Sequence, residues 1–97
     1  MNPTPAFFLP LIGSTFSIDT QAGPVPLRLE SCAEAPRRGL PEQFRAPLSL
    51  VFSGPAQPLL VQDNYYVDHP AMERQVWCIA PTPPKQADAQ HYMVIFA

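Results

Sequence analysis

The sequence predicts an all-β fold, either a small antiparallel sandwich or a partly open barrel of about seven strands. One observation behind this prediction is that short runs of β-branched and aromatic residues alternate with clusters of Gly, Pro, Asn and Asp, which is the pattern of strands joined by turns. The other is that 14 of the 97 residues are proline. Because a proline inside a helix costs about 3 kcal/mol, this content excludes long helices.

An N-terminal hairpin is predicted from two alternating runs, residues 14–19 and residues 25–31, which flank a turn at residues 20–24. Side chains two positions apart on a strand share a face, so each run has one apolar side and one polar side. The positions expected to face the core are Phe16, Ile18, Val25, Leu27 and Leu29.

Residues 48–81 carry the densest strand signals, and we expect them to form a β-meander at the centre of the fold. The candidate strands are residues 48–52, 65–67 and 75–80. Residues 33–47, which precede this segment, contain three prolines, a glycine and three arginines, so we expect a long loop there. A chain of this length supports one domain, residues 1–97, that buries roughly 65% of its unfolded surface.

Both ends of the chain are apolar, and we expect them to contact other proteins. Residues 1–10 are predicted to form an extended arm, because prolines at positions 3, 5 and 10 favour polyproline or edge-strand geometry. The last strand, residues 91–97, is apolar on both faces. We therefore expect one face to be covered by the domain and the other by the arm, the proline-rich loop or a second molecule. Alternatively, the arm closes over the domain's own core. The predicted interaction residues are Phe7, Phe8, Leu9, Ile95 and Phe96.

The composition excludes several classes of partner. A net charge of −2 with a single lysine provides no basic surface for nucleic acid or anionic membranes. The longest apolar runs are far shorter than the roughly 20 residues of a membrane span. Charged residues make up 14% of the chain, against about 25% in an average soluble protein, which indicates a buried interface and a homo-oligomer. Without a basic leader segment, we expect cytoplasmic synthesis without a signal peptide, and the final location stays open.

No metal or cofactor is expected from the sequence motifs. Cys32 and Cys78 are far apart and have no CxxC or Cys/His spacing around them, so we expect free, buried thiols, with a disulfide as the alternative. Neither a GxGxxG nor a GxxxxGK[ST] motif is present, which argues against a phosphate-binding loop.

Aromatic side chains suggest an alternative function, a module that binds carbohydrates or small ligands. The candidate platform consists of Tyr65, Tyr66 and Trp77. Aromatic rings supply binding area to such sites, but they also fill cores. Tyr65 and Trp77 are the residues that we expect on an outward face.

A hydrolase is a further alternative with little support. Nucleophilic catalysis needs a Ser or Cys beside a general base and an orienting third group. The chain has two histidines, His69 and His91, and no GxSxG motif. A local turn before Pro70 explains Asp68 and His69 without catalysis.

Several turn and strand signatures resemble an uncharacterised family of small bacterial all-β domains, often encoded near fibre proteins with a phage tail-collar domain of the microcystin-dependent type. They are residues 13–16, 50–54, 62–65, 69–70 and 92–96, together with Pro81. The resemblance implies a structural or assembly role beside phage-tail-like fibres and supplies no catalytic residues. We therefore predict a non-enzymatic assembly module whose partners are proteins, either copies of itself or a fibre or tail-collar protein.

Overall fold

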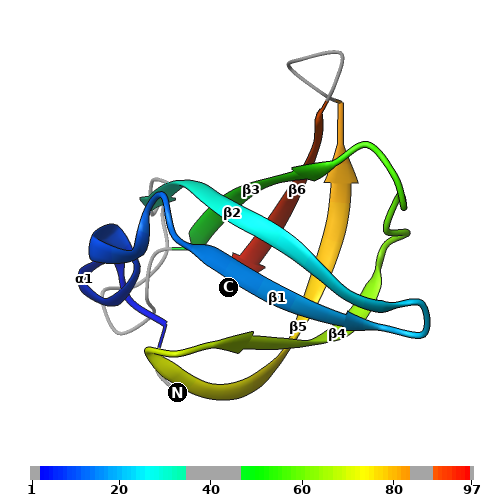
Figure 1. Cartoon of the computed structure of the whole chain (residues 1–97). Helices are drawn as coiled ribbons and strands as arrows, with labels where there is room; N and C mark the ends of the chain where they lie inside the picture. Colours follow the sequence, from blue (N-terminus) through cyan, green and yellow to red (C-terminus); the bar gives the residue numbers. More distant parts are fainter. Residues whose placement is uncertain (1–2, 35–46, 84–88, 97) are drawn as a thin grey trace.

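Antiparallel strands close into a barrel in the computed structural model, which describes residues 3–34, 47–83 and 89–96 (Figure 1). The strands are β1 (Thr15–Thr20), β2 (Gly23–Glu34), β3 (Leu48–Pro55), β4 (Asp63–His69), β5 (Met72–Thr82) and β6 (Ala89–Phe96). Their order around the barrel is β1-β2-β3-β6-β5-β4, and β4 pairs with β1 to complete the ring. The predicted all-β class is confirmed, as a barrel that is closed and has six strands among the described residues.

The N-terminal hairpin has the predicted alternation. Phe16 lies opposite Leu27 in the pairing of β1 with β2, and all five positions predicted to face the core are buried. Gly23 has a φ of +106°, a backbone conformation that residues with a Cβ rarely adopt. The hydroxyl of Thr20 donates to the Gly23 carbonyl at 2.6 Å, so side chain and backbone together fix the turn between the two strands.

The predicted meander is correct for β4 and β5 and wrong for β3. β4 and β5 form a hairpin in which Tyr65 lies opposite Trp77, but β3 pairs with β2 and β6 instead of β4. The connection from β3 to β4 crosses one end of the barrel (Figure 1). Leu60 anchors it there, because its side chain is buried and its N–H donates to the hydroxyl oxygen of Tyr92 at 2.9 Å.

The predicted extended arm is wrong, because the N-terminal segment is helical. It forms α1 (Pro5–Phe8) and the 3-10 helix η1 (Leu9–Leu11). Thr4 caps α1 by accepting a hydrogen bond from the Phe7 N–H at 3.3 Å, and a proline stands at the start of each helical turn. Proline is well suited to the first helical turn, where its missing N–H costs nothing and its fixed φ is already helical.

Residues 33–47, predicted as a long loop, begin inside a strand. β2 continues through Glu34, and residues 35–46 lie outside the part of the chain that the structure describes. Among the described helices, none is long and apolar enough to cross a membrane.

Candidate interaction site

β5 and β6 pair over only part of their length. The described register runs from Ala80 opposite Met93 to Thr82 opposite His91. Beyond this point the strands diverge (Figure 1): residues 94–96 of β6 continue to pair with β3, whereas the earlier part of β5 pairs with β4. Within the described chain, residues 94–96 therefore have a strand neighbour on one side. We call their other side the β6 edge; the unpaired side of an edge strand presents backbone N–H and C=O groups.

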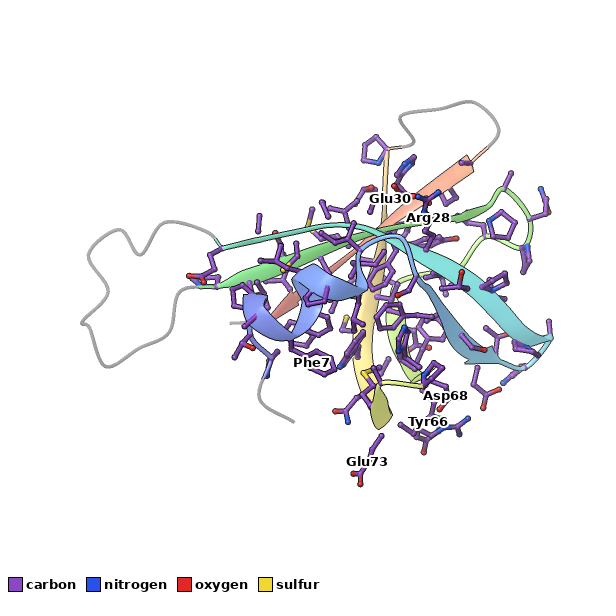
Figure 2. All side chains as sticks on the ribbon, turned by 60° about the vertical axis from the view of Figure 1, so that its left-hand side comes forward. Phe7, Arg28, Glu30, Tyr66, Asp68 and Glu73 are labelled. Atoms are coloured by element: carbon purple, nitrogen blue, oxygen red, sulfur yellow. The ribbon has the colours of Figure 1, made fainter. Side chains whose placement is uncertain are left out.

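Aromatic rings fill the interior where β5 and β6 diverge. Phe8 is fully buried, with its ring centroid 5.8 Å from that of Trp77 on β5 and 6.0 Å from that of Phe96 on β6. Phe7 packs edge-on against Phe8 at 5.0 Å, on the side of α1 that faces the barrel (Figure 2). The structure therefore brings the two apolar ends of the chain together.

The five predicted interaction residues fall into two groups. Phe8 is part of the core, and Phe7 and Phe96 are partly buried against it. The N-terminal segment therefore packs on its own domain, which is the alternative that the sequence left open. Phe8 cannot contact a partner without leaving the core, which corrects the prediction for this residue. Leu9 and Ile95 are exposed, Ile95 to 61% of its surface.

An uncharged outer surface extends from Ile95 across β3 to β2. Residues that lie opposite each other on antiparallel strands point to the same side of the sheet. The pairings place six outward side chains in two rows, Ser31–Val51–Met93 and Ala33–Ser49–Ile95. We call this surface the β2–β3–β6 face. Its Ile95 end is exposed in the single chain, because Tyr92 and Val94 point into the barrel and Ile95 points away from it. Cover of this side by a second molecule, one of the predicted possibilities, stays a prediction.

The predicted aromatic platform is divided between two sides of the sheet. Tyr65 and Trp77 face each other across β4 and β5; Trp77 is buried and Tyr65 partly buried, so the outward orientation predicted for them is wrong. Tyr66 is the exposed member of the three. One tyrosine of an adjacent pair must point inward, and the sequence alone did not determine which one.

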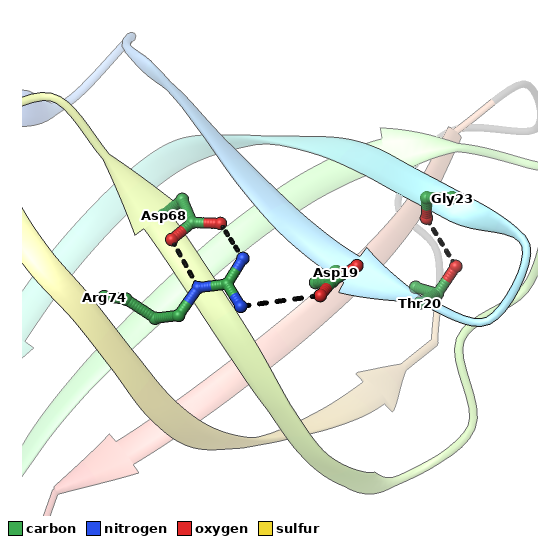
Figure 3. Close-up of polar contacts among 5 residues, drawn as sticks. All are labelled: Asp19, Thr20, Gly23, Asp68 and Arg74. Atoms are coloured by element: carbon green, nitrogen blue, oxygen red, sulfur yellow. Dashed lines mark hydrogen bonds and ion pairs between the residues drawn. The ribbon is translucent and has the colours of Figure 1, made fainter.

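Tyr66 belongs to a polar cluster on the outer surface of β1, β4 and β5. The guanidinium of Arg74 lies 4.9 Å from the centre of the Tyr66 ring and donates two hydrogen bonds to the Asp68 carboxylate, at 2.9 and 2.7 Å (Figure 3). Arg74 also lies 3.6 Å from the Asp19 carboxylate. The hydrogen bond from Arg74 lowers the pKa of Asp68. This cluster ties together three strands where β1 and β4 close the barrel.

His69 connects the N-terminal helices to the turn between β4 and β5. Its Nδ1 accepts from the Ala71 N–H at 3.0 Å, and its Nε2 lies 3.0 Å from the Ser14 hydroxyl, which itself donates to the Leu11 carbonyl. A neutral ring with an acceptor at Nδ1 carries its proton on Nε2, so His69 donates to Ser14. A general base would need the opposite arrangement, a free lone pair facing the hydroxyl. The Ser14–His69 pair is thus arranged to hold the chain together.

Both cysteines are free thiols. Cys32 is half-buried, and burial raises its pKa, with the nearby charge of Glu34 acting in the same direction. Cys78 is exposed, in contrast to the buried position expected for it. Among the described residues, no group of three His, Cys, Asp or Glu side chains could hold a metal ion.

Comparisons with known proteins identify one family. Its model, described as "Domain of unknown function (DUF6916)", matches residues 3–96, nearly the whole chain. An uncharacterised family that spans most of the chain is what the turn and strand signatures predicted. Searches of curated proteins and of solved structures give no match.

Proposed function

We propose that this chain, which belongs to the DUF6916 family, is a non-enzymatic assembly module that binds protein through the β6 edge and the β2–β3–β6 face. Its first partner is a second copy of itself. The setting that we propose is a phage-tail-like fibre or filament, of which the chain is a subunit or an assembly partner. The observation that carries the binding mode is that residues 94–96 pair with β3 on one side while Ile95 is 61% exposed.

The chemistry of the β6 edge favours the addition of a strand. Natural proteins protect edge strands with lysines, prolines, inward charges or bulges. Val94, Ile95 and Phe96 include none of these protections. An added strand would gain main-chain hydrogen bonds, and alternate side chains such as Ile95 would supply specificity.

Composition and resemblance support the assembly role from two further directions. The chain has few charged residues for its surface, and the β2–β3–β6 face has none. Uncharged, partly apolar patches of this kind are more frequent at protein interfaces than on free surfaces. The fibre setting rests on the resemblance of the sequence signatures. That resemblance implies genes encoded near those of fibre proteins, and it does not imply a mechanism.

The alternative function, a module that binds carbohydrates or small ligands, has less support. Its three aromatic residues do not share a face, and Trp77 is buried. Tyr66 alone would provide one exposed ring, already stacked under Arg74.

The assembly proposal is tested with Ile95→Arg, compared with Val76→Arg as a matched control. Both residues are exposed on strands, Ile95 to 61% and Val76 to 58%, so both variants should fold. A charge at Ile95 would have to be desolvated in the assembly, whereas a charge at Val76 on β5 would stay in water. By multi-angle light scattering we expect the unmodified protein and Val76→Arg to have a mass of at least two chains, and Ile95→Arg to be a monomer.

Two results would contradict the proposal. One is an unmodified protein that is monomeric at all accessible concentrations. The other is an assembly that Ile95→Arg leaves intact.

A further inference from the structure

A second open site lies on the side of the barrel away from α1. It is a cleft of about 660 Å³ between the β1–β2 turn and the connection that leads into β4. In Figure 1 both segments are at the end of the molecule opposite to α1. The side chains that matter for its chemistry belong to Asp19, Leu59, Val61, Asp63 and Tyr65.

The cleft contains a strand edge that has a strand neighbour on one side only. Residues 63–65 of β4 pair with β5, from Asp63 opposite Ile79 to Tyr65 opposite Trp77. The pairing of β4 with β1 begins only at Tyr66, opposite Asp19. Within the described chain, residues 63–65 therefore have one strand neighbour, and all three line the cleft. An extended peptide in the cleft could add to this edge through main-chain hydrogen bonds. The Asn64 N–H in this stretch donates to the Asp63 carboxylate at 2.8 Å, so a bound peptide would replace this contact.

An apolar wall stands beside this edge. Leu59 is 55% exposed and Val61 64% exposed, although both are apolar. Their positions are fixed, because Leu60 between them is buried and hydrogen-bonded to Tyr92, and the Val61 carbonyl accepts from the Tyr65 hydroxyl at 2.7 Å. A wall that is already ordered loses little conformational entropy when a ligand binds.

The charge of the cleft determines which peptide fits. Asp19 and Asp63 supply two carboxylates, and none of the described residues that line the cleft is basic. Arg74 lies 3.6 Å from Asp19, but its two hydrogen bonds go to Asp68. A ligand with positive side chains is therefore complementary to the cleft, and one with negative side chains is repelled.

We propose that this cleft binds an extended segment of a partner protein in which apolar and basic side chains alternate. The segment adds as a strand to residues 63–65. Its apolar side chains pack on Leu59 and Val61, and its basic side chains approach Asp19 and Asp63. This site is distinct from the β6 edge and does not depend on self-assembly.

The test is a titration of the isotopically labelled full chain with two synthetic peptides, followed by nuclear magnetic resonance. The probes are Ac-Leu-Lys-Leu-Lys-Leu-NH2 and its charge-reversed counterpart Ac-Leu-Glu-Leu-Glu-Leu-NH2. We expect the lysine peptide to shift the amide signals of residues 19–22 and 59–65 and to bind at least tenfold more tightly than the glutamate peptide. Asp63→Asn and Val61→Ser should each weaken binding several-fold, whereas Glu73→Gln, an exposed change outside the cleft, should not.

Three outcomes would overturn the proposal. They are equal affinity for the two peptides, no saturable binding of the lysine peptide, and shifts centred on residues 94–96 in place of the cleft. The same titration with Ile95→Arg, the variant expected to be monomeric, distinguishes the two sites, because peptide binding to the cleft should be unchanged in it.

Discussion

His69 shows how one side chain can link segments that are far apart in the sequence. It joins the β4–β5 turn to Ser14 and, through Ser14, to Leu11 at the end of η1, and its ring packs on Phe16 with centroids 4.3 Å apart. Protonation would put a hydrogen on Nδ1, where the Ala71 N–H already points. The neutral form is therefore the one that fits.

This arrangement predicts a dependence of stability on pH. Burial lowers the pKa of His69 in the folded state below its ordinary value near 6.5. As the pH falls through that value, the unfolded chain binds a proton that the folded chain resists, so the free energy of unfolding decreases. We expect urea midpoints to fall between pH 7.5 and pH 5.5, and to fall less in His69→Asn, whose side chain can still accept from Ala71. Equal losses in the two proteins would show that His69 is not responsible.

Among the elements, α1 differs most from the sequence prediction. The prolines predict an extended chain, but Pro5 and Pro10 each stand in a first helical turn, where proline is equally compatible with the backbone. Local sequence does not distinguish these two outcomes. The burial of Phe8 against Trp77 and Phe96, which are distant in the sequence, favours the helix.

Phe8 and its neighbour Leu9 test the structural role of this element. Phe8→Ala should lower the free energy of unfolding by about 3–5 kcal/mol, because it leaves a cavity beneath α1. Leu9→Ala, one position later but exposed, should change it by less than about 0.5 kcal/mol. Chemical denaturation of the two variants measures the difference. Similar small effects would mean that α1 is a detachable arm after all.

For the strands, the sequence predicted which side chains face the core better than it predicted which strands pair. The inward positions of β1 and β2 follow from the alternation of apolar and polar residues, which is visible in the local sequence. The pairing of β3 with β6 joins segments that are far apart in the sequence, and no local pattern encodes it. The predicted outward orientation of Tyr65 is wrong for a similar reason, since either register leaves one of the two tyrosines inside and local sequence does not distinguish them.

At the scale of the whole molecule, the barrel is closed, but two of its strand pairs, β5–β6 and β1–β4, are hydrogen-bonded over only part of their length. β5 leaves β6 after a few pairs, and β4 meets β1 only from Tyr66 onwards. Each divergence leaves a stretch of strand with one neighbour, at the β6 edge and in the cleft. The sequence predicts more apolar side chains than one small domain can bury. The pairing register then shows that some of them lie beside strand segments that have only one neighbour.

The central claim is that the β6 edge is covered by a second copy of the chain. Hydrogen–deuterium exchange of the segment 91–97, measured at low and high protein concentration, tests it most directly. We predict that deuterium uptake in this segment falls as concentration rises in the unmodified protein and stays constant in Ile95→Arg. Uptake that does not change with concentration in the unmodified protein, or that falls equally in Ile95→Arg, would contradict the claim.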